Sequence, residues 1–390
     1  MKKRFFDMRK MRLTFLFAFI FISFFCSAQK YYLFTGTYTK FPGTNTNTGS
    51  KGIYVYSFNA TTGKMKWISN TDSTSNPSYL TVSSNRNYVY AVNETNGANP
   101  GRVSAFSFNK KNGALHLLNT QFSGGDDPCY VATNASDKWL TVANYTSGSA
   151  AIFPINKNGS LQPYAQLIKD SGSSINKDRQ ESAHVHETVF SQDNAYLFTP
   201  DLGMDKVMIY KFNPAGKKPL TPSNPPYVSI KPGSGPRHIT FHPNKKFAYL
   251  VSELAGSVTA FKYNNGKFFQ IQSISAHPED FKGTIGSAEI NVSPDGKFLY
   301  VSNRGDENTI TIFSINSITG KLKLVGYQST LGKAPRNFII DPSGNFLLVA
   351  NQDTDNIIIF KRDKKTGLLK ETGEQIHVPK PVCLQLIPMN

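Results

Sequence analysis

The sequence predicts an all-β protein: a seven-bladed β-propeller whose ring is closed by pairing the N- and C-terminal strands. Two observations lead to this fold class. A motif of two apolar strands around a polar turn recurs along the chain, and a turn ending in glycine recurs with the same period. Repeats of about 50 residues with four short strands each are typical of propellers, which leave only short protected strand edges.

The recurring hairpin is clearest in GPRHITFHPNKKFAYLVSE, residues 235–253, where the strands ITF and FAYLVS flank a polar turn. A third alternating strand follows each hairpin, as in VMIYKF or SVTAFKY. The alternation of apolar and polar residues in these segments indicates strands rather than helices. Six such segments, 51, 57, 51, 51 and 48 residues apart, begin at Pro77, Pro128, Val185, Pro236, Ser287 and Pro335.

Turn glycines give a second, independent count of the blades. Glycine after Asn or Thr supplies the positive φ that a tight hairpin turn needs, so we expect that conformation at each of these positions. The seven glycines are Gly63, Gly113, Gly159, Gly216, Gly266, Gly320 and Gly367.

The seventh blade is expected to be split between the two ends of the chain. Its outer strands are YYLFTGTY, GIYVYSF and KMKWISN near the N-terminus, and its innermost strand is PVCLQLIP near the C-terminus. A solenoid could have the same period, but its end repeats would need caps. Complementary partial repeats at the two ends favour a closed ring.

The N-terminal segment has the features of an export signal. Basic residues in the first 12 positions precede an apolar run from Leu13 to Phe25, and Cys26-Ser27-Ala28 supplies small residues for cleavage. We therefore expect a signal peptide over 1–28, one propeller domain over 29–390, and a periplasmic or secreted protein. Lipidation of Cys26 is the alternative, which bulky Phe25 disfavours.

Composition restricts the partners. The chain has 390 residues, 39% hydrophobic, with a formal net charge of +17. No later segment has the roughly 20 apolar residues that a membrane span needs, so no membrane insertion is expected after signal removal. The lysines are scattered through turns and no nucleic-acid-binding motif is present, so we expect an anionic small molecule as partner, no nucleic acid, and a monomer. Only Cys129 and Cys383 follow the signal, which provides no disulfide framework.

The hairpin geometry places particular residues at one mouth of the channel. If the first residue of each segment is position 0, positions 1 and 17 lie at the same end of the hairpin. Position 1 holds Ser78, Cys129, His186, Arg237, Ala288 and Arg336. Position 17 holds Glu94, Tyr145, Leu202, Glu253, Arg304 and Gln352. Position 16 is always small and polar, namely Asn93, Asn144, Asp201, Ser252, Asn303 and Asn351.

Charges of both signs therefore converge at this mouth. Guanidinium groups suit carboxylate and phosphate geometry, so the pocket should prefer an anionic substrate. A carboxylate beside a histidine can activate water, and arginine can stabilise an oxyanion. For the pair Arg237 and Glu253 a purely structural ion pair is an equal alternative. We expect substrate-binding residues at His184, Arg336, Asn144, Tyr145, Asp201 and Glu94.

A metal site has little support. His184 and His186 form an H-x-H pair whose side chains share one face of a strand, but two ligands do not make a site. No G-x-S-x-G elbow and no phosphate-binding glycine loop is present, which disfavours serine hydrolases and nucleotide chemistry. We expect neither metal nor cofactor. Four further histidines in turns or outer strands are expected at the surface, namely His116, His242, His277 and His377.

Four segments together resemble the seven-bladed propeller lactonase family, which includes 6-phosphogluconolactonases and carboxymuconate cyclases. They are AHVHETVFSQDNAYLFTPDLGMDKV, GPRHITFHPNKKFAYLVSELAGSV, SAEINVSPDGKFLYVSNR and APRNFIIDPSGNFLLVANQ. The resemblance implies metal-independent hydrolysis, or the reverse closure, of a lactone of an anionic sugar or dicarboxylic acid. It also implies catalytic roles for His186, Arg237, Glu253 and Arg304.

The leading hypothesis is a lactonase in which Glu253, aided by His186, takes a proton from the attacking water. Arg237 and Arg304 would then bind the anion or the oxyanion. An export signal makes aldonolactones other than 6-phosphogluconolactone reasonable substrates. Two alternatives stay open: a non-catalytic surface binding propeller and a metal-dependent sugar lactonase.

Overall fold

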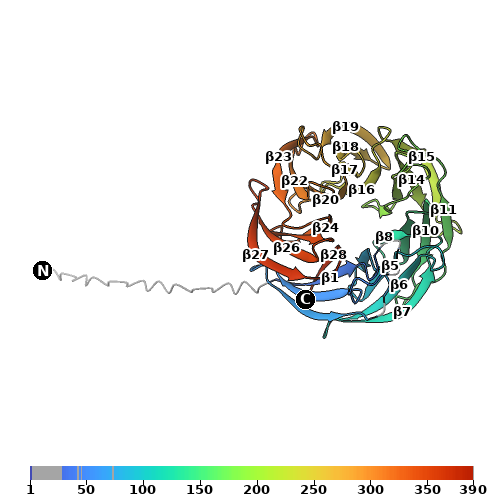
Figure 1. Ribbon diagram of the computed structural model, residues 1–390, viewed down its shortest axis with the longest axis horizontal. Helices are drawn as coiled ribbons and strands as arrows, with labels where there is room; N and C mark the ends of the chain where they lie inside the picture. The colour runs from blue at the N-terminus through green and yellow to red at the C-terminus, as the bar shows by residue number, and fades with distance from the viewer. Residues whose placement is uncertain (2–28, 42–43, 45, 73, 390) are drawn as a thin grey trace.

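The computed structural model describes Met1 and residues 29–41, 44, 46–72 and 74–389. The predicted signal peptide over 1–28 thus lies, apart from Met1, outside the described residues. Within them the chain forms 28 strands in seven four-stranded antiparallel sheets and no helix. The sheets are arranged as the blades of a ring (Figure 1). Residues of the innermost strands, among them Tyr130, Ile239, Glu289 and Leu384, line a cavity in the central channel of this ring. No helix long and apolar enough to cross a bilayer occurs in this part of the chain.

Each blade is built from consecutive strands, except the one that joins the two ends of the chain. That blade has the order β28-β1-β2-β3, with β28 (Pro381–Pro388), β1 (Lys30–Thr37), β2 (Tyr54–Asn59) and β3 (Met65–Asn70). The next blades are β4 (Leu80–Val82), β5 (Tyr88–Asn93), β6 (Arg102–Asn109) and β7 (Ala114–Phe122), then β8 (Pro128–Thr133), β9 (Trp139–Asn144), β10 (Ser149–Pro154) and β11 (Gln166–Lys169).

The other four blades follow the same order from the channel outward. They are β12 (Val189–Phe190), β13 (Tyr196–Asp201), β14 (Lys206–Phe212) and β15 (Leu220–Ser229); β16 (Pro236–Phe241), β17 (Phe247–Ser252), β18 (Ser257–Asn264) and β19 (Lys267–Ser275); β20 (Ser287–Val292), β21 (Phe298–Asn303), β22 (Thr309–Ile315) and β23 (Leu322–Ser329); and β24 (Pro335–Ile340), β25 (Phe346–Asn351), β26 (Asn356–Arg362) and β27 (Leu369–His377).

The predicted ring closure is confirmed. Strands β28 and β1 pair antiparallel, with Tyr31 opposite Pro388 and Gly36 opposite Cys383. In Figure 1 the C-terminal strand β28 lies beside the N-terminal strand β1. This pairing excludes the solenoid alternative, because no repeat is left at a free end.

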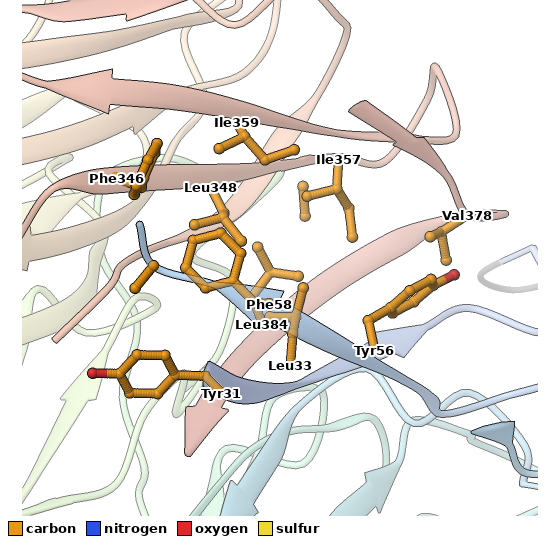
Figure 2. Close-up of a cluster of buried hydrophobic side chains, with 12 residues drawn as sticks. Tyr31, Leu33, Tyr56, Phe58, Phe346, Leu348, Ile357, Ile359, Val378 and Leu384 are labelled. Carbon is orange, nitrogen blue, oxygen red and sulfur yellow. The ribbon is translucent and has the colours of Figure 1, made fainter. Parts of the chain in front are cut away.

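Burial explains why the middle strands read as nearly continuous apolar runs. All six residues of β25, FLLVAN, are buried, whereas in the outermost strand β27 only Leu369 is buried and the other positions are exposed or half-buried. A blade has a neighbour on each side, so both faces of its inner strands pack against other blades. Figure 2 shows such an interface, where Leu33 and Leu384 of the split blade lie near Leu348 and Ile357 of the blade β24–β27.

Six of the seven turn glycines have the predicted positive φ, and Gly216 does not. Gly216 follows Ala215 in a looser turn, so the Asn-Gly or Thr-Gly chemistry is missing there. Other turn glycines also permit close packing between blades. A Cβ on Gly320 would meet the Phe247 ring at 2.4 Å, and the Gly320 carbonyl accepts a hydrogen bond from Tyr249 Oη at 3.0 Å.

Two of the histidines expected at the surface are buried, namely His242 and His277. His242 Nε2 lies 2.8 Å from the Gly296 carbonyl oxygen in the turn of the next blade, and His277 Nδ1 pairs with Glu307. Their strand-end positions resembled solvent turns, but adjacent blades cover them. His116 and His377 are exposed as predicted.

Replacing Leu384 by alanine should destabilise the ring. Leu384 is buried in the cluster of Figure 2, and Leu→Ala changes in cores typically cost about 2–5 kcal/mol of unfolding free energy. The matched control is Leu324→Ala on outermost strand β23, where the side chain is exposed and the expected change is within about 0.5 kcal/mol. Denaturant unfolding measures both, and equal midpoints for the two variants would contradict the closure argument.

Candidate active site

The predicted mouth residues gather at one end of the channel, where each blade contributes the residue directly after its second strand. Tyr38, Glu94, Tyr145, Glu253 and Arg304 follow β1, β5, β9, β17 and β21 in this way. Antiparallel pairing places the second residue of the innermost strand beside this position, as β16 and β17 place Arg237 beside Glu253.

Glu253 is surrounded by three guanidinium groups. Its Oε2 accepts hydrogen bonds from Arg237 Nε at 2.9 Å and lies 3.0 Å from Arg304 Nη2, while its Oε1 accepts one from Arg179 Nη2 at 2.9 Å. Burial would raise the pKa of Glu253, but the three arginines outweigh burial and hold this pKa far below its usual value. Glu253 is therefore a permanent negative charge and a weak proton acceptor.

The arginines differ in how deeply they are buried and in whether a ligand can reach their guanidinium groups. Arg237 is fully buried and also donates from Nη1 to the Ala288 carbonyl at 2.7 Å. The side chains of Arg304 and Arg336 are 18% and 17% exposed, so they can reach a ligand in the mouth. Burial lowers the pKa of Arg304 to about 10, with Arg237 and Arg336 adding to the effect, yet the group stays cationic at neutral pH.

The mouth contains a second carboxylate, Glu94, in a different environment. Tyr38 Oη donates a hydrogen bond to Glu94 Oε1 at 2.8 Å, and Arg336 Nη2 lies 4.0 Å from Glu94 Oε2. Burial raises the pKa of Glu94 above its ordinary value of 4.5, despite Arg336 and Tyr38, which act to lower it. Glu94 is consequently a stronger base than Glu253.

His186 lies beneath the rim and is almost completely buried. Its Nδ1 is 3.9 Å from Cys129 Sγ, and its ring lies 5.1 Å from that of His238. Burial, together with the nearby Arg237, holds the pKa of His186 well below 6.5, so the ring is neutral at physiological pH. A neutral imidazole can accept a hydrogen bond from water or from a substrate hydroxyl.

Both ring nitrogens of His184 lie beside oxygen atoms of the protein. Its ring stacks on Tyr145 at 4.6 Å, its Nδ1 lies 3.1 Å from the Tyr145 carbonyl oxygen, and its Nε2 lies 3.0 Å from Glu181 Oε1. Both nitrogens are thus engaged, so the H-x-H pair does not converge on one point. Among the residues that the structure describes, no three His, Cys, Asp or Glu side chains are grouped to hold a metal ion.

Two of the predicted substrate-binding residues are in fact structural. Asn144 is fully buried and donates from Nδ2 to the Ser123 carbonyl at 3.0 Å and to Ser149 Oγ at 3.1 Å. Asp201 is fully buried and its Oδ1 accepts hydrogen bonds from the backbone N–H groups of His184 and Met204. Small polar residues at position 16 therefore hold loops, because one step along a strand turns the side chain away from the mouth.

The site also contains Arg179 and Tyr38, which the repeat alignment misses. Arg179 comes from the connection between β11 and β12, within the interval of 57 residues that exceeds the usual 51. That excess marked an insertion, although it could not show where the insertion folds. Tyr38 occupies position 17 of the split blade, and extending the register across the two termini would have found it.

Residues 32–386 match the family model described as "Lactonase, 7-bladed beta-propeller", and the chain belongs to this family. It is similar to a 6-phosphogluconolactonase of Formosa agariphila, with 40% identity over 91% of this chain and 99% of the relative. A 6-phosphogluconolactonase of Bacillus subtilis is 36% identical over 92% of this chain and 99% of the relative.

A solved structure supports the same assignment. The periplasmic gluconolactonase of Pseudomonas aeruginosa is 36% identical, with a TM-score of 0.86 over 93% of this chain and 100% of that one. The resemblance inferred from the four sequence segments is thus confirmed at the level of the family.

Replacing Glu253 by glutamine should lower stability by about 3–5 kcal/mol, because it leaves buried arginines without their counter-charge. Glu253 has a pKa below its value in the unfolded chain, so its stabilisation is complete above about pH 4.3 and decreases as the pH falls. The difference between wild type and variant in denaturant unfolding should therefore shrink in acid. Glu371→Gln on exposed β27 is the control, and a Glu253→Gln protein as stable as this control would refute the counter-charge role.

Proposed function

We propose that the protein is a lactonase that hydrolyses an anionic sugar lactone, in the manner of a 6-phosphogluconolactonase. The single observation that carries this proposal is the meeting of cationic and basic groups at one mouth. Arg304 and Arg336 are cationic and partly exposed there, Glu94 lies 4.0 Å from Arg336, and His186 is neutral. A substrate with an anionic group and a hydrolysable carbonyl matches this combination.

In this proposal the arginines bind and stabilise negative charge. Arg336 binds the carboxylate or phosphate of the substrate, and Arg304 donates to the carbonyl oxygen that becomes an oxyanion. Glu253 is a positioning residue, because its ion pairs hold Arg179, Arg237 and Arg304 at the mouth. Because these arginines are held in place before the substrate binds, the site needs less reorganisation to stabilise the negative charge of the transition state.

The proton of the attacking water passes to Glu94 rather than to Glu253. A bond forms between the water oxygen and the lactone carbonyl carbon, and the tetrahedral intermediate then releases the ring oxygen, which takes the proton back from Glu94. The hydroxy acid product ionises and releases one proton to solvent. His186 accepts a hydrogen bond from the water and orients it.

Glu94→Gln should reduce kcat/KM for lactone hydrolysis at least about 100-fold, since general base catalysis contributes 10²–10⁴-fold. The wild-type rate should rise with pH as Glu94 loses its proton, with a midpoint above 4.5, and the variant should lack this rise. Rates are corrected for spontaneous lactone opening. Glu253→Gln, measured under conditions where it is folded, should keep the pH-dependent rise; if Glu94→Gln retains both rate and pH profile, the base is elsewhere.

Arg336→Gln should raise KM for a phosphorylated aldonolactone more than for its unphosphorylated counterpart. A hydrogen bond to a charged group contributes roughly 1.5–3 kcal/mol, which corresponds to roughly 10–150-fold. Lys370→Gln on the exposed outer strand β27 is the control. Equal effects on the two lactones would contradict anion binding by Arg336.

We further propose that the enzyme acts in the periplasm or outside the cell. The expected export signal over 1–28 and the likeness to a periplasmic gluconolactonase support this location. Fractionation of cells into periplasm and cytoplasm tests it, and activity confined to the cytoplasm would overturn it.

A further inference from the structure

A cavity of about 780 Å³ adjoins the mouth and extends between two blades. It lies between the split blade and the blade β4–β7, and we call it the lateral groove. Its inner end is lined by Tyr38 and Glu94, its floor by Ser104 and Phe106 of β6, and its outer end by Leu117 of β7. The groove crosses several neighbouring strands, which are about 4.8 Å apart. It is therefore longer than one sugar ring bound at the mouth.

The lining of the lateral groove differs from the arginine side of the mouth. Twelve of its 23 lining residues are Asn, Ser or Thr, whose amide and hydroxyl groups both donate and accept hydrogen bonds. Its charges are mixed, with two basic side chains against three acidic ones, so it has no preference for an anion. These lining charges are Lys40, Arg102, Asp72, Glu94 and Asp127.

Hydrogen bonds between segments hold the groove walls in place. Asn93 Oδ1 accepts a hydrogen bond from Ser104 Oγ at 2.7 Å, and Asn93 Nδ2 donates to the Ser75 carbonyl at 2.8 Å. Asn76 Oδ1 accepts from the backbone N–H groups of Thr39 and Lys40, each at 2.9 Å. A pre-formed wall lowers the ordering cost of binding a ligand.

Two residues connect the groove with the proposed reaction centre. Tyr38 and Glu94 line the groove, and both also contact Arg336, whose guanidinium carbon lies 5.6 Å from the Tyr38 ring centre. Glu94 Oε2 is buried, makes no hydrogen bond within the described residues and lies 4.0 Å from Arg336 Nη2. A molecule held at the mouth can therefore continue into the groove.

We propose that the lateral groove is a subsite for an uncharged sugar unit attached to the lactone, so that a lactone extended by one sugar is hydrolysed more efficiently than the matching single-ring lactone. This inference rests on the proposed lactonase function. The mouth binds the lactone end, and amide and hydroxyl side chains of the groove bind the hydroxyls of the attached sugar. A groove of this volume lies within the range of pockets that enclose small organic ligands.

The experiment compares kcat/KM for glucono-δ-lactone with that for disaccharide aldonic acid δ-lactones, 4-linked and 6-linked, all corrected for spontaneous opening. Asn70→Trp and Leu117→Trp obstruct the groove from its two walls, and neither residue belongs to the proposed catalytic machinery. Ser136→Trp, in another surface cavity, is the matched control. Thermal unfolding verifies that all variants are folded.

We expect at least one disaccharide lactone to be preferred about tenfold or more by the wild type and the Ser136→Trp control. Both groove variants should bring this ratio close to one and leave glucono-δ-lactone turnover and unfolding temperature unchanged. A wild-type ratio of one or less for both linkages, or a ratio that neither groove variant changes, would overturn the subsite.

If neither these lactones nor 6-phosphogluconolactone is hydrolysed, the proposed function fails and the groove is tested separately. Calorimetry then compares binding of the disaccharide aldonates with that of gluconate. Tighter binding of a disaccharide aldonate that is lost in Asn70→Trp and Leu117→Trp supports the subsite. Equal binding of the disaccharide aldonates and gluconate overturns it.

Discussion

The pairing of β28 with β1 is the constraint on which the rest of the structure depends. Every blade must cover the apolar faces of two neighbours, and only a closed ring gives each of seven blades both neighbours. The split blade holds the two ends of the chain in one sheet through backbone hydrogen bonds from Tyr31 to Thr37. This closure keeps the seven strand ends at a fixed distance from one axis, and the mouth exists because of it.

Glu253 holds the arginines of the mouth together, as the pairing of β28 with β1 holds the ring together. Several guanidinium groups cannot remain close together in a buried place without a counter-charge, since uncompensated buried charge is costly. One carboxylate accepts from Arg179, Arg237 and Arg304, which come from a long connection and two different blades. The same contacts that assemble the arginines make Glu253 a poor base. The two carboxylates of the mouth are therefore chemically different although their positions in the repeat are equivalent.

The mouth and the lateral groove form one continuous surface, along which the side chains change from cationic to uncharged polar groups. Cationic groups dominate near Arg304 and Arg336, and uncharged amides and hydroxyls dominate beyond Tyr38 and Glu94. Propeller repeats are built from similar strands, so this change comes almost entirely from the residues that follow the second strand of each blade and from the connections between blades. Function in this fold is thus located in a small number of positions on a repetitive frame.

The repeat period, the strand alternation and the split blade were readable from the sequence, because alternation and turn chemistry are local and the repeats count the blades. The meeting of His186, Arg237, Glu253 and Arg304 at one mouth followed from that count. Tertiary structure alone decided that Arg179 reaches Glu253. It also decided that the side chains of Asn144 and Asp201 point away from the mouth and hold loops, and that adjacent blades bury His242 and His277. It also decided which carboxylate is the stronger base, because a pKa depends on burial and on charges that distant segments bring within a few ångströms.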